Sequence, residues 1–171
     1  AIERTAQLFS DLPLWIDELQ LKANPEHQKM LTYLIASGQG KMRMARDGGL
    51  RETVRFRNVA LSTGEQTLVT DADLGGQDAR VLELYGRPLD DDDLGRAAHD
   101  CAESHHGHAG PRFLEKLVQA ERHEIQARYR ELFQVIAPAF PGVHPSKIAA
   151  RSVLALADIL TRQWVFDDTT D

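Results

Sequence analysis

The stretch Leu12-Pro13-Leu14-Trp15-Ile16-Asp17-Glu18 predicts a buried strand that ends in two adjacent acids. A short continuous apolar run is typical of a parallel strand, because such strands are covered on both faces. The carboxyl end of a parallel strand lies at the sheet edge where open α/β proteins bind ligands. We therefore expect Asp17 and Glu18 to face a ligand. Two acids that cap a following helix are the plainer alternative.

An apolar strand followed by two acids is also the pattern of a Walker B strand in a P-loop ATPase. In such a site Asp17 would hold Mg²⁺ through its water shell, and Glu18 would orient and polarise the attacking water. The phosphate loop G-x-x-x-x-G-K-[ST] does not occur in the 171 residues. The pattern therefore favours the back half of an ATPase whose phosphate loop lies upstream, with ATP and Mg²⁺ bound only by the full-length protein.

The rest of residues 1–88 predicts strands with an interleaved helix and hairpin. In chain order we expect a helix from Pro25 to a C-cap at Gly38, hairpin arms 41–46 and 50–56 around Asp47-Gly48-Gly49, a strand at 59–61 and a third strand at 80–85. Ser62 and Thr63 follow the second strand directly. In helicase-type ATPases the strand after such a hairpin carries a polar tip that contacts the γ-phosphate or the attacking water. A simple strand-ending turn would also use these residues.

Residues 89–171 predict an all-helical region. The expected helices run from the acidic residues 90–93 to about His106, from Pro111 to about Val135, and from Ser146 to about Phe166. The predicted fold class is α/β: the back half of a P-loop, AAA+-like sheet with a β-hairpin insertion, followed by an all-helical lid region.

A basic segment stands out in a chain whose net charge is −6. Residues 40–57 hold six Lys or Arg against two acids, a local charge of +4. Such a patch is where a polyanion would bind. The candidate DNA-binding residues are Lys41, Arg43, Arg46 and Arg51. From charge alone, a solvated charged hairpin is the favoured interpretation.

The composition is that of an ordinary globular chain, with 42% hydrophobic and 27% charged residues. No apolar stretch approaches the roughly 20 residues of a membrane helix, so no membrane partner is expected. The single cysteine, Cys101, excludes an internal disulfide framework and favours a cytoplasmic location.

Two segments resemble the family known as domain of unknown function 927, often labelled superfamily II helicase-like. They are 56–65, which contains Ser-Thr-Gly-Glu, and 76–83, which contains Gly-Gln followed two residues later by Arg. Similar features occur at Tyr33, 38–43, 106–110, Phe113-Leu114, Arg151 and 153–160. The resemblance extends over nearly the whole chain.

This resemblance implies an AAA+ ATPase related in layout to MCM-like and superfamily III helicases of phages, plasmids and other mobile elements. It implies a homo-oligomer, a hexamer in the full-length protein, that acts on single-stranded DNA as a replicative helicase or loader. Ser62 or Thr63 would serve the nucleotide site, and Arg80 would be an arginine finger for the neighbouring subunit. Arg112 follows Gly110-Pro111 at the start of a lid helix, and this placement alone makes it a candidate second phosphate sensor that binds the nucleotide.

Other classes stay open. A catalytically inactive DNA-binding module with AAA+ shape would keep the basic hairpin, and an isolated oligomerisation domain would show a concentration-dependent mass. A zinc site at Cys101, His105, His106 and His108 is disfavoured, because histidines around Gly107 suit a helix C-terminus. Cys101 also lacks the Gly-rich elbow of a nucleophile.

Overall fold

The computed structural model describes residues 2–18, 25–42, 44, 49, 52–69, 76–86 and 89–168. The chain divides into two compact units, Ala1–Glu83 and Leu84–Asp171. We call them the N-terminal and C-terminal units and describe each on its own. The division falls slightly before the predicted one after residue 88.

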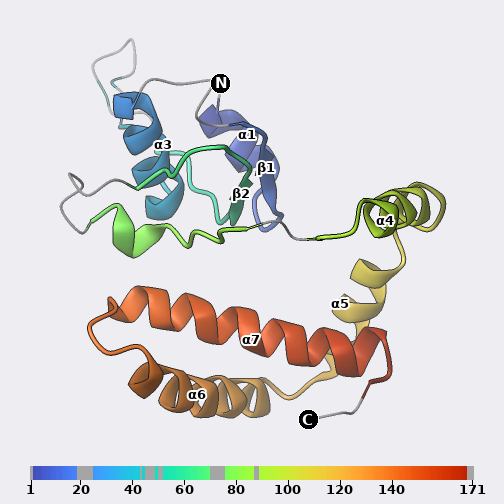
Figure 1. Ribbon diagram of the computed structural model, residues 1–171. Helices are drawn as coiled ribbons and strands as arrows, with labels where there is room; N and C mark the ends of the chain where they lie inside the picture. The colour runs from blue at the N-terminus through green and yellow to red at the C-terminus, as the bar shows by residue number, and fades with distance from the viewer. Residues whose placement is uncertain are drawn as a thin grey trace. The chain divides into compact units, whose positions relative to one another are not determined.

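The N-terminal unit contains a small parallel sheet with helices around it (Figure 1). Its elements are α1 (Ile2–Leu8), β1 (Leu14–Ile16), α3 (Pro25–Ser37), β2 (Ala60–Ser62) and the 3-10 turn η1 (Asp78–Arg80). Strands β1 and β2 pair in parallel, with Leu14 opposite Ala60, Trp15 opposite Leu61 and Ile16 opposite Ser62. Both predicted strands are present, the first shortened to Leu14–Ile16 and the second shifted by one residue. Their predicted burial is wrong for β2, whose three residues are all exposed, and holds for only Leu14 of β1.

The core of this unit joins segments that are far apart in sequence. Ala6, Leu14 and Phe56 are buried, and Ile16, Leu34, Ile35 and Val54 pack against them. Helix α1, strand β1, helix α3 and the segment before β2 thus share one apolar cluster. Strand β1 contributes Leu14 and Ile16 to this cluster, and Phe56 belongs to the segment that leads to β2.

Helix α3 begins and ends where the sequence predicts. Gly38 adopts a φ of +64°, and its N–H donates to the carbonyl of Ile35 at 3.1 Å. Left-handed backbone after a helix favours glycine, because it lacks a Cβ. A Cβ at Gly38 would also lie 2.7 Å from the Phe56 carbonyl oxygen, so glycine is required twice over.

The base of the predicted hairpin is present. Gln39 and Arg55 form an antiparallel bridge, the Gly40 N–H donates to Val54 O at 2.8 Å, and the Phe56 N–H donates to Gly38 O at 3.0 Å. The chain therefore leaves α3 and returns toward β2 along an antiparallel path. The turn at 47–48, together with Arg43, Arg46 and Arg51, lies outside the described residues.

The predicted third strand at 80–85 is wrong in this structure. Residues 78–80 form the 3-10 turn η1, and residues 81–86 have no strand partner within the described part of the chain. Leu84 and Tyr85 are almost fully exposed. Alternating polarity favours a strand only where a neighbouring strand and a covered face exist, and local sequence does not supply these.

The C-terminal unit is helical, as predicted. It contains α4 (Asp92–Ser104), α5 (Ala109–Gln119), α6 (Arg122–Ala139) and α7 (Pro145–Val165). The Asp91 carboxylate caps α4 by accepting from the N–H groups of Asp93 and Leu94 at 2.8 and 3.3 Å. This confirms the predicted role of the acidic run as a helix start.

The single long helix predicted from Pro111 to Val135 is wrong. Extended backbone at Ala120 and Glu121 separates α5 from α6. Neither residue is Gly or Pro, so no local stop signal marks the break. The break allows both helices to contact α7, which packs against α6 and against α5.

Helices α6 and α7 lie side by side (Figure 1). Arg128 near the start of α6 donates to Gln163 near the end of α7 at 3.0 Å, so the two helices run antiparallel. Ile148, Ser152, Leu156 and Leu160 form the buried stripe of α7 at a spacing of four residues. Among the described helices, none is long and apolar enough to cross a membrane.

Candidate functional site

The carboxyl ends of β1 and β2 meet at one edge of the small sheet. In the parallel register, Asp17 and Thr63 each follow the last paired residue of their strand. The Thr63 hydroxyl donates a hydrogen bond to the Asp17 carboxylate, across 46 residues of sequence. The structure therefore brings together the predicted metal-binding acid and one of the two predicted polar sensors.

Glu18 adopts an uncommon backbone conformation at this edge. Its φ is +50°, in the left-handed region that non-glycine residues rarely occupy. The turn directs the Glu18 N–H toward Thr63, whose Oγ1 accepts it at 3.2 Å. Outliers of this kind persist where surrounding contacts hold them, and they occur often at functional sites.

Ser62 behaves differently from its neighbour. Its hydroxyl donates to the Thr63 carbonyl at 3.1 Å. Thr63 donates a hydrogen bond to Asp17, whereas Ser62 does not. The sequence left open which of the two is the polar tip of β2, and this geometry favours Thr63. The side chains of Asp17, Glu18, Ser62 and Thr63 are all exposed in this chain.

An open groove of the N-terminal unit lies away from this edge. It has a volume of about 960 Å³ and is lined by residues 10–13, 35–39 and 55–59. These segments precede β1 and β2, so the groove lies at their amino ends, whereas Asp17 and Thr63 follow the carboxyl ends. We give the carboxyl edge more weight, because the groove walls are occupied by contacts that hold the fold together.

Those contacts explain part of the sequence pattern at 56–59. Arg57 forms a two-point ion pair with Asp11 at 2.7 and 3.1 Å, and the carboxylate raises the pKa of Arg57, first by its hydrogen bond and then by its charge. The Asn58 amide donates to the carbonyls of Phe9 and Leu12 at 2.6 and 3.2 Å. Both residues fasten the α1–β1 turn to the segment before β2.

Arg80, the predicted arginine finger, is held within its own unit. Its guanidinium lies 4.8 Å from the ring centroid of Tyr33 on α3, a cation–π contact, and it donates to the Gly76 carbonyl. Tyr33 also lies so close to Gly76 that a Cβ there would be 2.6 Å from the phenol oxygen. No recorded contact joins Arg80 to Asp17 or Thr63 among the described residues.

Sequence reasoning missed the roles of Tyr33, Gln77 and Glu83 around this arginine. Gln77 is 2% exposed and donates to the Leu68 carbonyl at 2.7 Å. The Glu83 carboxylate accepts from the N–H groups of Leu68 and Val69 at 2.7 and 3.3 Å. The motif around Gly76 thus binds the segment after β2. The Gly76-Gln77 pair therefore indicates close packing: Gly76 leaves room for Tyr33, and Gln77 is buried.

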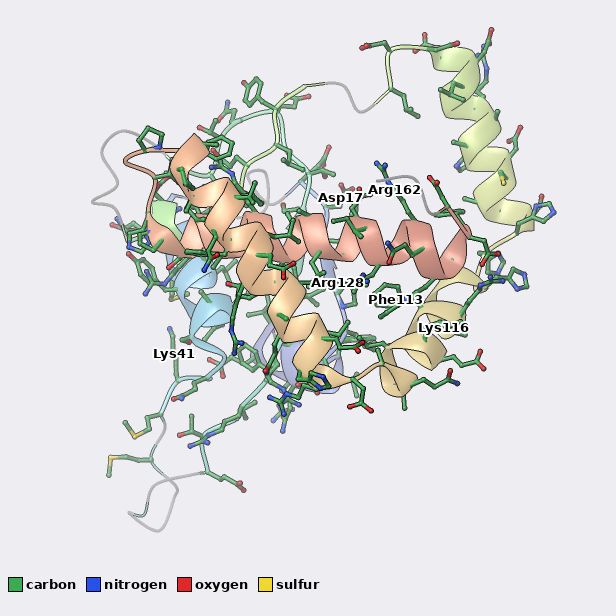
Figure 2. All side chains as sticks on the ribbon, turned by 90° about the horizontal axis from the view of Figure 1, so that it is seen from below. Asp17, Lys41, Phe113, Lys116, Arg128 and Arg162 are labelled. Carbon is green, nitrogen blue, oxygen red and sulfur yellow. The ribbon has the colours of Figure 1, made fainter. Side chains whose placement is uncertain are left out.

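Lys41 lies where the hairpin leaves α3. Its N–H donates to Glu3 Oε1 on α1 at 3.3 Å, and its ammonium donates to Met30 Sδ on α3 at 3.1 Å. Figure 2 shows Lys41 at the base of an arm that extends from the helix. Of the four candidate DNA-binding residues, Lys41 is the one whose contacts the structure describes.

Arg112, the predicted second phosphate sensor, has a structural partner. It lies on α5 and donates to both Asp167 carboxylate oxygens at 2.8 Å and to the Trp164 carbonyl at 2.8 Å. Phe113 beside it packs on the Trp164 ring, with centroids 5.2 Å apart. These contacts fasten α5 to the end of α7, so binding a phosphate would require Arg112 to leave Asp167.

The comparisons bear on the first third of the chain. Residues 1–55 match a family model described as "Domain of unknown function (DUF927)". The match spans β1, Asp17, Glu18, α3 and the hairpin segment, and ends before 56–83, where the sequence resemblance is most specific. No curated protein and no solved structure matches the chain.

The DUF927 match does not extend to the Cys/His cluster at 101–108, which begins in α4 and continues beyond it. Cys101 is exposed, and the His106 ring contacts the Glu103 carbonyl at 3.1 Å through Nδ1. In the described part of the chain, no group of three or more His, Cys, Asp or Glu residues is placed to hold a metal ion. A Mg²⁺ ion held by one carboxylate, water and nucleotide phosphates needs no such cluster.

Proposed function

We propose that this chain is the Walker B-to-lid portion of a DNA-dependent ATPase with a P-loop, AAA+-like sheet. The observation that supports it is the Asp17–Thr63–Glu18 arrangement at the carboxyl edge of two parallel strands. The Asp17 carboxylate, the Thr63 hydroxyl and the backbone N–H of Glu18 meet there, at the ends of two paired strands. This is the edge at which α/β sheets bind ligands.

Each residue has a role that its position permits. Asp17 would hold Mg²⁺ through water, and the Thr63 hydroxyl that donates to it would fix the orientation of its carboxylate. Glu18, whose backbone is turned back toward Thr63, would accept hydrogen bonds from the attacking water. The chemistry supplied by Mg²⁺ is charge neutralisation on the β- and γ-phosphates.

In this proposal the phosphate loop is supplied by residues outside this sequence, which does not contain the motif. The exposure of all four side chains at the strand ends fits a site that is closed by further elements of a longer protein. We propose that ATP and Mg²⁺ bind there, that the protein forms a homo-oligomer, and that single-stranded DNA is its partner. Arg80 would then serve the site of the neighbouring subunit.

The test is ATP hydrolysis by the native full-length gene product, with and without single-stranded DNA. We expect Glu18→Gln to lower turnover by about 100-fold or more, because it removes the base that polarises water. Thr63→Val should lower turnover and Thr63→Ser should retain most of it, because only the hydroxyl is needed for the Asp17 hydrogen bond.

Turnover that is absent in the wild type, while DNA binding is retained, would contradict the enzyme proposal. It would favour a catalytically inactive DNA-binding module, the function that the basic segment at 40–57 supports independently of Asp17. Equal turnover of Thr63→Val and the wild type would show that the Thr63 hydroxyl has no role in hydrolysis.

A further inference from the structure

A histidine closes the turn between α6 and α7 (Figure 1). His144 is the N-cap residue of α7, and its ring nitrogen Nδ1 accepts a hydrogen bond from the Ser146 N–H at 3.2 Å. The usual N-cap residues are Asn, Asp, Ser and Thr, whose charge is constant near neutral pH. Imidazole side chains, by contrast, change charge between about pH 5 and pH 8. This cap therefore depends on the protonation state of one ring.

The hydrogen bond shows which form of the ring closes the cap. A backbone N–H can only donate, so Nδ1 of His144 must offer a lone pair, and the ring proton lies on Nε2. A second proton on Nδ1 removes that lone pair. It also places a positive charge at the amino end of α7, where the helix dipole favours negative charge. Both effects have the same sign: the neutral ring closes the cap, and the charged ring opens it.

The charged groups around this turn act in the same direction. Residues 132–143, which include the end of α6, contain no Asp, Glu, Lys or Arg. The first charged residues of α7 are Lys147 and Arg151, both basic, and they would repel a protonated ring. Helix α5 packs against the other end of α7, near Trp164. Among the described residues, no acid pairs with His144 to offset its charge.

Two other histidines of the C-terminal unit have the opposite surroundings. Nε2 of His99 lies 3.6 Å from the Glu103 carboxylate, and Nδ1 of His123 lies 3.8 Å from the Glu121 carboxylate. Protonation of either ring adds an attraction to an acid. The effect of pH on the α6–α7 turn is therefore specific to His144, and His99 provides a matched control.

The remaining contacts of this turn do not need the imidazole lone pair. The His144 carbonyl accepts from the Lys147 N–H at 2.9 Å, and Ile148 is buried. The Arg151 guanidinium lies 4.4 Å from the ring centroid of Phe140, just after α6. These contacts hold α7 from its second turn onward. Loss of the cap should therefore loosen the first turn and leave the rest of the helix folded.

We propose that His144 is a pH-sensitive cap, which keeps the α6–α7 turn closed while its ring is neutral and opens the turn when the ring is protonated. The stability that the cap contributes is present at high pH and is lost as the pH falls. This switch requires neither a nucleotide nor DNA. Its test is therefore independent of the proposed ATPase.

The experiment measures amide exchange with solvent by NMR in this 171-residue chain at two pH values, expressed as protection factors. Between about pH 8 and about pH 5.5, protection of the Ser146 N–H should fall by about threefold to tenfold. The Asp93 N–H is capped by the Asp91 carboxylate, which stays ionised over this range. Its protection should therefore stay within about twofold.

Three variants isolate the ring. His144→Asn keeps a side-chain acceptor that does not titrate, so Ser146 should stay protected at both pH values. His144→Ala has no side-chain cap, so Ser146 should be weakly protected at both. His99→Asn removes a different histidine and should leave the pH dependence at Ser146 as it is in the wild type. Far-UV circular dichroism at both pH values checks that the helices of each protein stay folded.

Three results would overturn the inference. The first is a protection factor of Ser146 that does not change with pH in the wild type. The second is the same pH dependence in His144→Asn as in the wild type. The third is equal protection of Ser146 in His144→Ala and the wild type at about pH 8. A loss of helical signal in the wild type at the lower pH would also contradict a switch that is confined to one turn.

Discussion

Thr63 shows how one residue links fold and candidate chemistry. Its hydroxyl donates to Asp17 and accepts from the Glu18 N–H, so a single side chain connects the ends of both strands. The hydroxyl can do both because it is a donor and an acceptor at once. The same oxygen that supports the left-handed turn at Glu18 therefore also positions the predicted metal ligand.

Gly76 is the residue where packing next to Arg80 can be tested. A Cβ at this position would lie 2.6 Å from the Tyr33 hydroxyl oxygen and 3.6 Å from Cζ. We expect Gly76→Ala to lower the free energy of unfolding by about 1–3 kcal/mol through this overlap. In a Tyr33→Phe background the oxygen is gone and the next atom is at ordinary contact distance, so the same substitution should cost much less.

Chemical denaturation of the four proteins in this double-mutant cycle measures the effect. A coupling of about 0.5 kcal/mol or more between the two positions is expected. Equal costs of Gly76→Ala in both backgrounds would mean that Tyr33 does not occupy the space over Gly76.

At the scale of elements, local backbone chemistry decides where glycine is required. Gly95 lies inside α4 and Gly142 lies between α6 and α7, and a Cβ at either position would meet open space. They differ in backbone conformation, because Gly142 has a φ of +83°. This pair therefore separates the effect of conformation from that of packing.

We expect Gly95→Ala to stabilise α4 by about 0.5–1 kcal/mol, because alanine loses less backbone entropy in a helix. Gly142→Ala should destabilise the connection between α6 and α7 by about 1–2 kcal/mol, because left-handed backbone strains a residue with a Cβ. Amide hydrogen exchange measures both: slower exchange across α4 in the first variant and faster exchange around residues 140–144 in the second. Slower exchange in both would contradict the conformational argument.

At the scale of the whole molecule, the division into two units makes separate unfolding transitions testable. The chain has two tryptophans, Trp15 in the N-terminal unit and Trp164 in the C-terminal unit. Trp15→Phe leaves Trp164 as the reporter of the C-terminal unit, and Trp164→Phe leaves Trp15 as the reporter of the other. Each unit has its own buried residues, including Phe56 and Leu160, both 3% exposed.

Phe56→Ala should lower the free energy of unfolding reported by Trp15 fluorescence by about 3–5 kcal/mol. Leu160→Ala should lower the free energy of unfolding reported by Trp164 fluorescence by about 2–5 kcal/mol. Each substitution should leave the other reporter's transition unchanged, because the deleted side chain belongs to one core. Denaturant titrations followed by tryptophan fluorescence provide the measurement. A shift of both transitions by either substitution would show that the units unfold together.

The sequence by itself determined the features that depend on nearest neighbours. The two strands, the end of α3 at Gly38, the start of α4 at the acidic run 90–93 and the pair of acids after β1 were all predicted from short stretches. The end of α3 and the cap of α4 depend on contacts within a few residues, namely the absence of a Cβ and a side-chain cap. The strands were indicated by their apolar composition, although their pairing joins 14–16 to 60–62. Such signals are complete within a short window of sequence.

Only the tertiary structure decided which distant residues meet. It paired Thr63, and not Ser62, with Asp17, placed Arg80 on Tyr33, engaged Arg112 with Asp167, and divided one predicted helix into α5 and α6. These outcomes depend on strand register and helix packing between residues tens of positions apart. A shift of one residue exchanges the faces of a strand, so register follows from which face tertiary packing buries, and a short stretch such as β2, exposed throughout, does not specify it.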